Sequence, residues 1–264
     1  MNTIKNKRFL RVMIVVFVVF VMQLKTYAAG ISKEEAIKDF VSASVAYKDE
    51  DYDKAINLYN KIINGGWESG AIYYNLGNSY FRKGDIGRAI LSYERARRLI
   101  PADSDLNYNL RYVRSFIGTK VRVPRYNLVY RFIKRLSKEY NQDFLALMMV
   151  ISFLVMSISF LVATYSKLSH KNVYIIIILV FSLLFFMCFF ISMYKLNIEG
   201  NLAVVVKKTD ARFEPRSDST VHFKLYPGLE VKILKQEGGW AKIKREDGKR
   251  GWLPKDCFER VDLH

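Results

Sequence analysis

The chain has 264 residues, of which 51% are hydrophobic, and its formal net charge is +17 at pH 7. Its two cysteines, Cys188 and Cys257, fall in an apolar run and in a polar segment, so we expect neither a disulfide framework nor a cysteine-based metal site. The three histidines share no metal-binding spacing and no glycine-rich loop follows a strand, so we expect a non-enzyme with no catalytic residue, metal or cofactor.

Residues 1–28 are typical of an export signal. A basic start that includes Arg8 precedes the apolar run Val12–Val21, and Thr26 and Ala28 supply the small residues of a cleavage site. The apolar run is short for a transmembrane helix. We therefore predict a signal peptide that is cleaved after Ala28, and an uncleaved anchor is the alternative.

Residues 31–117 contain an internal period of 34 residues. Three pairs of identical residues share this spacing: Asp51 and Asp85, Ala55 and Ala89, and Tyr59 and Tyr93. The second copy is the clearer one, because Tyr73–Tyr80 opens it and Pro101 ends its second helix. With small residues such as Gly77, the segment resembles the tetratricopeptide repeat. We expect two units followed by a capping helix over Ser104–Phe116.

The resemblance implies a groove for partner proteins on the leading helix of each unit. The family's groove positions are occupied here by Phe40, Ser44, Tyr47, Lys48, Tyr74, Asn78, Phe81, Arg82, Tyr108 and Tyr112. Phe40 and Ser44 stand where a clamp for a terminal carboxylate would carry basic residues, so a full clamp is not expected. For any single aromatic residue of this set, packing is the competing interpretation.

The linker formed by residues 118–142 is basic and amphipathic. In Tyr126–Tyr140, apolar side chains recur at helical spacing. Four basic residues occupy the other side: Arg131, Lys134, Arg135 and Lys138. Such a helix can lie in the headgroup plane of a membrane and contact anionic lipid. We predict lipid contacts for these four residues and no nucleic-acid binding, and packing on the preceding domain is the alternative.

Two uncharged apolar runs, Phe144–Tyr165 and Val173–Tyr194, are each long enough to cross the roughly 30 Å core of a bilayer as a helix. Only Ser166–Asn172 separates them, which predicts a transmembrane hairpin with both soluble parts on one side. The export signal favours the periplasm, whereas the basic linker favours the opposite side under the positive-inside rule. We give the export signal more weight, because a leading export sequence usually dominates.

From Leu202 the pattern changes to short β-branched runs separated by turn signals, and five short strands in residues 201–263 predict a small barrel. Three segments resemble the bacterial SH3 domain: Leu225–Gly228, Gly239–Ile243 and Gly251–Pro254. The resemblance implies a groove lined by Tyr226, Trp240 and Trp252, with cell-wall peptides as one class of ligand. The alternative is that the tryptophans belong to the core.

The fold class that we predict is multidomain, with an all-α tetratricopeptide helical repeat, a two-helix transmembrane hairpin and an all-β SH3-like small barrel. This order resembles the BatE family of bacterial proteins, and Tyr74–Asn78, Gly84–Ala89 and Trp240–Pro254 carry most of the likeness. The resemblance implies a scaffold at the bacterial inner membrane, linked to aerotolerance. Its implied partners are von Willebrand factor A domain membrane proteins and a MoxR-type ATPase system.

We therefore predict a non-enzymatic adaptor that is anchored in the membrane, with both soluble domains in the periplasm. The alternative is a sensor of cell-wall or peptide ligands that acts through the SH3-like domain. A sensor needs cytoplasmic machinery, and the predicted cytoplasmic part is only Ser166–Asn172. This observation favours the adaptor.

Overall fold

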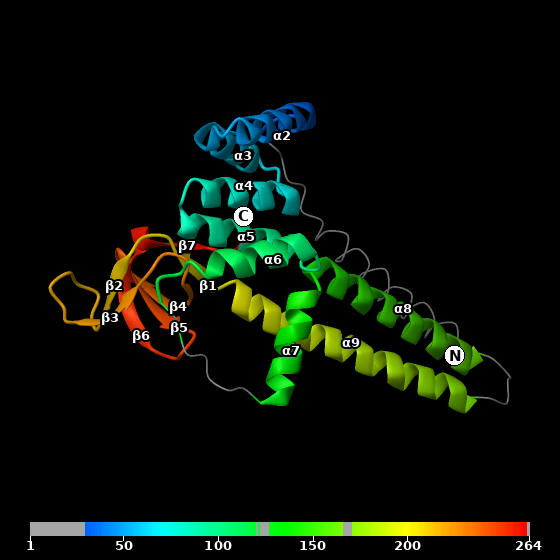
Figure 1. Cartoon of the computed structure of the whole chain (residues 1–264). Coiled ribbons are helices and arrows are strands. Elements are labelled where there is room, and N and C mark those ends of the chain that lie inside the picture. The colour runs from blue at the N-terminus through cyan, green and yellow to red at the C-terminus, as the bar shows by residue number, and fades with distance from the viewer. Residues whose placement is uncertain (1–29, 120, 122–126, 166–170, 263–264) are drawn as a thin grey trace.

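The computed structural model describes residues 30–119, 121, 127–165 and 171–262, so the predicted signal peptide lies outside the described residues. A stack of helices, a pair of long apolar helices and a β-sheet meet at one end of the apolar pair (Figure 1). The helices are α2 (Lys33–Lys48), α3 (Tyr52–Asn64), α4 (Gly70–Arg82), α5 (Ile86–Leu99), α6 (Ser104–Arg114), α7 (Leu128–Glu139), α8 (Gln142–Tyr165) and α9 (Lys171–Glu199). Helix α6 is thus shorter than the predicted capping helix at its C-terminal end.

The 34-residue period is visible in how the stacked helices begin. In each of the helices α3 to α6, a side-chain oxygen just before the first turn accepts a backbone N–H hydrogen bond. The four capping residues are Asp51, Ser69, Asp85 and Asp103. Asp51 and Asp85 are one period apart, and so are Ser69 and Asp103. The period therefore repeats the helix boundaries as well as the core.

The turns inside the two repeat units adopt the same left-handed backbone. Gly84 precedes α5 with a φ of 87°, and Glu50, one period earlier, precedes α3 with a φ of 61°. Glycine enters this region without steric cost, whereas a residue with a Cβ does not. The first unit therefore carries a strained residue where the second has a glycine.

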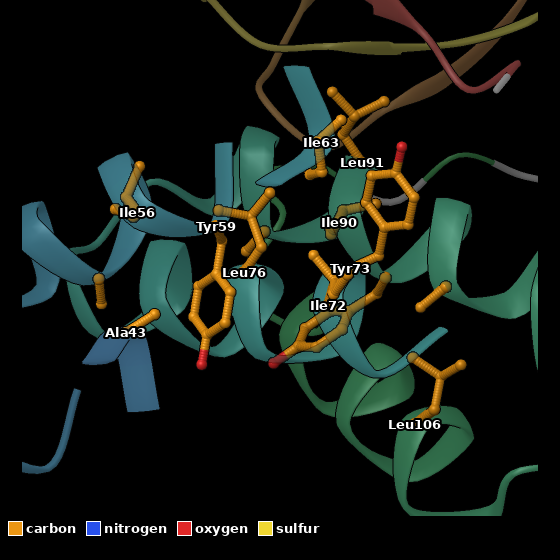
Figure 2. Packing of buried hydrophobic residues seen from close by; sticks show 14 of the residues in the cluster. Ala43, Ile56, Tyr59, Ile63, Ile72, Tyr73, Leu76, Ile90, Leu91 and Leu106 are labelled. Carbon is orange, nitrogen blue, oxygen red and sulfur yellow. The ribbon is translucent and has the colours of Figure 1, made fainter. Parts of the chain in front are cut away.

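Small residues let the helices of a unit approach closely. A Cβ on Gly77 of α4 would lie 2.7 Å from the ring of Tyr93 on α5, and Ala89 is fully buried. Figure 2 shows Tyr73 and Leu76 among the buried side chains of this core. The close approach explains why the repeat requires small residues at these two positions.

Helices α8 and α9 are long and apolar enough to cross a membrane, and they contain the two predicted spans. They pack along each other, and Leu145, Cys188 and Ile191 form a shared apolar cluster between them. Large apolar side chains such as Phe160 and Leu183 point outward. The pair thus presents an apolar surface, as a helix pair in a bilayer does.

Helix α7 crosses the end of this pair that lies closest to the other domains (Figure 1). Its Tyr130 ring meets the ring of Tyr194 on α9 edge to face, with centroids 6.0 Å apart. Leu136 packs on the cluster between α8 and α9. The Lys195 ammonium donates a hydrogen bond to the carbonyl oxygen of Tyr140 at 2.7 Å. These contacts attach the amphipathic helix to the apolar pair.

The C-terminal part is an antiparallel sheet in the order β3-β2-β6-β5-β4-β1-β7. Its strands are β1 (Leu202–Val205), β2 (Thr209–Arg212), β3 (Val221–Leu225), β4 (Glu230–Glu237), β5 (Trp240–Arg245), β6 (Arg250–Pro254) and β7 (Phe258–Arg260). The described residues thus form seven strands, so the prediction of five was wrong. The prediction was low because β2 and β7 have only four and three residues and are rich in charged side chains, which hides their alternation.

Strand β1 is buried on both of its faces. Successive side chains of a strand point to opposite faces. Ala203 and Val205 accordingly lie in the core of the sheet, while Val204 and the next residue, Val206, lie in the core of the helical stack. The helical repeat and the sheet therefore share one strand as their common wall.

Candidate functional site

The predicted groove residues largely meet at one hollow on the helical repeat, with a volume of about 260 Å³. Six of them line it: Tyr47, Asn78, Phe81, Arg82, Tyr108 and Tyr112. Phe40, Ser44, Lys48 and Tyr74 lie outside this lining. Three further lining residues were not predicted from the sequence: Tyr93, Asn109 and Val113.

Helical spacing could have indicated Asn109. Asn109 lies three residues before the predicted groove residue Tyr112 on α6, and residues with this spacing share one face of a helix. The period of 34 residues gives no such signal, because it relates Asn109 to Asn75, which is outside the lining of the hollow.

Polar groups at the hollow are held by hydrogen bonds. The Tyr93 hydroxyl donates to Asn78 Oδ1 at 2.7 Å, and Asn109 Nδ2 donates to the Tyr74 hydroxyl at 2.7 Å. Burial raises the pKa of Tyr93, so its hydroxyl stays protonated and remains a donor. These bonds fix the orientation of both amides, and a partner's backbone would meet amide groups that are already aligned.

Aromatic rings form the open side of the hollow. Phe81 contacts the ring of Tyr112 edge to face, with centroids 5.8 Å apart, and Phe116 lies against both rings at 5.6 and 5.2 Å. Tyr108 and Tyr112 are well exposed, with 63% and 50% of their surface accessible. Exposed aromatic rings that are held in place supply contact area at a low entropic cost. Phe116 is outside the lining of the hollow, and its support of these two rings was not predicted from the sequence.

Arg82 is held at the rim of the hollow by the first repeat unit. Its Nε donates to the Tyr52 hydroxyl at 3.1 Å, and its guanidinium carbon lies 5.5 Å from the centre of that ring. Glu50 lies 3.8 Å away. The hydrogen bond to Tyr52 is the main cause that raises the pKa of Arg82. About half of the side chain is still exposed, so the guanidinium can also receive an acidic group of a partner.

The three residues predicted for a groove on the sheet lie in different surroundings. Trp240 and Trp252 belong to the face of β5 and β6 opposite the core, where Lys242 lies 5.8 Å from the Trp252 ring centre. Trp252 is only 8% exposed, whereas Trp240 is partly exposed. Tyr226 packs on the core of the sheet and lies beside Gly118. Trp240 and Tyr226 are thus both partly exposed, and Trp252 is the one of the three that offers little ring surface to a ligand.

The four predicted lipid-contacting residues of α7 lie in two different kinds of surroundings. Arg131 and Arg135 are exposed, and Arg135 pairs with Glu139 on the same helix at 2.7 Å. Lys134 instead pairs at 3.2 Å with Glu246 in the turn between β5 and β6, and Lys138 lines a cavity between the sheet and the helices. Two of the four side chains thus face the protein, because α7 lies against the sheet as well as the apolar pair.

A buried charge cluster joins the helical repeat to the sheet. The Glu94 side chain on α5 is only 2% exposed and pairs with Arg97 and Arg114, and Arg114 also pairs with Glu230 of β4. Burial raises the pKa of Glu94. Burial alone would also raise the pKa of Glu230, but the nearby cations, Arg114 foremost, hold it below its usual value. This cluster was not predicted from the sequence, because its members are distant in the chain: Arg114 and Glu230 are 116 residues apart.

No arrangement for catalysis or metal binding emerges from the part of the chain that the structure describes. Within that part, no group of three or more histidine, cysteine, aspartate or glutamate side chains could hold a metal ion. The residues with shifted pKa values mostly lie in structural ion pairs or in buried positions of the helical stack. The aromatic, amide and cationic groups of the hollow are suited to binding a partner.

Comparisons with known proteins agree with this architecture. The family model for the tetratricopeptide repeat matches residues 70–103, and the family model for the bacterial SH3 domain matches residues 208–259. A comparison with curated proteins finds no match. The predicted fold class is confirmed: a helical region with a tetratricopeptide repeat, two apolar helices and an antiparallel, SH3-like all-β domain. Both domain types are typically non-catalytic interaction modules.

Proposed function

We propose that this protein is a non-enzymatic adaptor, anchored in a membrane by α8 and α9, that binds partner proteins in the hollow of its helical repeat. The observation that carries the proposal is the convergence of six groove residues on that hollow. Their exposed rings and aligned amides suit a peptide segment of a partner, and Arg82 at the rim favours a segment that carries a carboxylate.

The two soluble modules are proposed to lie on the same side of the membrane. Two crossings by adjacent helices lead to this arrangement, and the shared strand β1 supports it, because the modules contact each other directly. The match to the bacterial SH3 domain favours the periplasm or the cell exterior over the cytoplasm. The inner membrane of a bacterium is therefore the proposed location.

Helix α7 is proposed to rest on the membrane surface. Leu128, Val129 and Phe132 are exposed apolar residues of this helix, and Arg131 and Arg135 are exposed cations beside them. Such a surface buries its apolar side chains at the headgroup boundary and attracts anionic lipid. The likeness to the BatE family extends the proposal to partners of that system, namely von Willebrand factor A domain proteins and a MoxR-type ATPase.

A second candidate function is the binding of cell-wall peptides by the SH3-like domain. The observation that favours it is the partly exposed Trp240, which lies on the same face of β5 as Lys242. Binding of the purified full chain to cell-wall sacculi tests this candidate. A Trp240→Ala variant should lose the binding, and binding that persists in this variant would contradict the assignment of the ligand site.

The adaptor is tested by placing a photo-reactive amino acid at position 108, on the exposed side of the hollow, in cells that produce the full chain. We expect cross-links to a discrete partner protein, and the substitutions Asn78→Ala and Tyr112→Ala should abolish them. The same photo-reactive residue at position 54, on the exposed side of α3, is the control. Cross-links that persist in the double variant, or that are equal at both positions, would rule out this hollow as the partner site.

A further inference from the structure

A cavity of about 320 Å³ lies where α5, α7, the end of α9 and the sheet meet. Eight of its sixteen lining residues are lysine or arginine, and three are glutamates. The cavity is distinct from the hollow on the repeat, since the two share no lining residue. An excess of positive charge around a cavity attracts anions.

The three carboxylates of the cavity are already engaged by other cations. Glu94 pairs with Arg97 and Arg114, and Glu230 also pairs with Arg114. Glu246 pairs with Lys134 at 3.2 Å. Among the described residues, none of these three carboxylates forms an ion pair with Lys138, Lys232 or Lys244, although the charges of Glu94 and Glu230 act on Lys138 from a greater distance.

Two lysines of the cavity lie opposite each other on neighbouring strands of the sheet. Lys232 of β4 and Lys244 of β5 are directly opposite in the strand register. Like charges in this position destabilise a sheet. Lys232 donates a hydrogen bond to the neutral amide oxygen of Asn197 at 3.1 Å, and Lys244 has no side-chain hydrogen bond or ion pair with the described residues. An anion between the two ammonium groups would convert a repulsive contact into an attractive one.

A third lysine adds to this arrangement from α7. Lys138 lines the same cavity. Desolvation by the surrounding protein atoms, followed by the charge of Arg97, lowers the pKa of Lys138. The side chain as a whole is exposed, so an anion from the solvent can reach its ammonium group and offset the repulsion from Arg97.

The cavity lies beside the end of the apolar pair. Lys195, which also lines it, is the first charged residue of α9 after an uncharged run that begins at Asn172. In a bilayer, this place in the chain corresponds to the headgroup level, where the phosphates of lipids lie.

We propose that this cavity binds a phosphate-bearing anion between Lys138, Lys195, Lys232 and Lys244. Ammonium groups are strong donors to phosphate oxygens, and the protein walls exclude part of the water, which strengthens each bond. The anion is the headgroup of an anionic lipid or a soluble phosphate compound, and the two sources share this chemistry. The site differs from the exposed surface of α7, because it is built from three separate segments of the chain.

The test uses the full chain in a neutral detergent and compares it with the double variant Lys232→Gln/Lys244→Gln. One arm follows thermal unfolding during titration with inorganic pyrophosphate, at an ionic strength kept constant with sodium chloride. The other arm uses native mass spectrometry to measure how much phosphatidylglycerol or phosphatidylcholine stays bound. The control variant is Lys224→Gln/Lys249→Gln, which removes two exposed lysines of the same domain outside the cavity.

We expect the cavity variant to raise the apparent dissociation constant of the anion about tenfold or more, because it loses charge-assisted hydrogen bonds. The control variant should bind as the unaltered chain does. Without added anion, the cavity variant should melt at an equal or higher temperature, since it no longer opposes two like charges. The melting temperature measured without anion therefore also shows that the cavity variant folds.

The two arms identify the source. Retention of phosphatidylglycerol over phosphatidylcholine indicates a lipid, and stabilisation by pyrophosphate alone indicates a soluble phosphate compound. The soluble arm does not depend on membrane anchoring, so its result is independent of the proposed function. Anion binding that is absent in the unaltered chain, or equal in the cavity variant and the unaltered chain, would overturn the proposal.

Discussion

Arg114, in the last turn of α6, pairs with Glu230, the first residue of β4, and the same guanidinium group reaches Glu94 on α5. One side chain thus links two helices of the repeat to the sheet. Two carboxylates that lie close together in a largely buried place depend on this cation for their charge balance.

Substitution Arg114→Met should therefore be strongly destabilising. It leaves Glu94 and Glu230 without their shared partner, and breaking a buried pair in this way typically costs about 3–5 kcal/mol. Thermal or denaturant unfolding of the full chain in detergent measures the loss. Arg111→Met is the matched control, because Arg111 is exposed on the same helix, and it should change stability little. Equal effects of the two substitutions would contradict the role of Arg114.

Gly87→Ala should push the repeat and the sheet apart. In a free helix, alanine is favoured over glycine by about 1 kcal/mol. Here, a Cβ at position 87 would lie 2.9 Å from the Cα of Val206 and 3.0 Å from the carbonyl oxygen of Val205. We expect a net destabilisation of about 1–3 kcal/mol, as for other overpacked positions.

Thermal unfolding and a spin-label distance between α3 and β6 measure the effect of Gly87→Ala. Gly239→Ala is the control, since a Cβ there meets no atom within 4 Å. A stabilised Gly87→Ala variant with an unchanged distance would show that the contact between α5 and β1 does not form.

Glu50→Gly should stabilise the first repeat unit. Glu50 has a φ of 61°, which costs about 1–2 kcal/mol for a residue with a Cβ. Glycine removes this strain but loses about 0.5–1 kcal/mol through the entropy of the unfolded chain, so a gain of up to about 1 kcal/mol remains. The ion pair with Arg82 is exposed and contributes little.

Differential scanning calorimetry of Glu50→Gly, with Glu50→Gln as control, separates backbone strain from charge. Glu50→Gln keeps the Cβ and should leave the unfolding temperature almost unchanged. If Glu50→Gln is as stable as Glu50→Gly, the strain at this turn is not the cause.

Asp247→Asn should destabilise the sheet in a pH-dependent way. Arg245 donates to both oxygens of the Asp247 carboxylate, at 3.0 and 2.6 Å, and both side chains are less than one-fifth exposed. The hydrogen bond from Arg245 lowers the pKa of Asp247. A lowered pKa in the folded state gives stability above the unfolded value of about 3.9, and this stability is lost as the pH falls through the folded value.

The unaltered chain should therefore exceed Asp247→Asn in stability by about 1–2 kcal/mol at pH 7, and the difference should shrink below about pH 4. Unfolding measured across this pH range checks the prediction. Asp218→Asn, at an exposed position of the same domain, should show almost no difference. A difference for Asp247→Asn that stays constant down to about pH 2 would contradict the ion pair as its cause.

Local patterns in the sequence predict most of the architecture. The period of 34 residues fixes which side chains of α4 and α6 face the same way, and Asn78, Tyr108 and Tyr112 do meet at one hollow. The contacts between domains could not be predicted, because the period gives no information on what covers α5. One signal was present, since Leu202–Val206 is an uninterrupted apolar run where a strand with one exposed face would alternate.

The surroundings of Lys134 and Lys138 also could not be predicted from local patterns in the sequence. Helical periodicity places both on the polar side of α7, and lipid was the natural partner for that side. The structure instead sets Lys134 beside Glu246 and Lys138 in the cavity. Which neighbour a polar face meets depends on contacts that are distant in the sequence.

The shared wall formed by β1 has a practical consequence for dissecting this protein. A fragment that ends after α6 would uncover the surface of α5 on which Val204 and Val206 pack, and the severed sheet would expose those valines to water. Both fragments are then expected to aggregate or to bind other proteins non-specifically, so pull-downs with either fragment would return false partners.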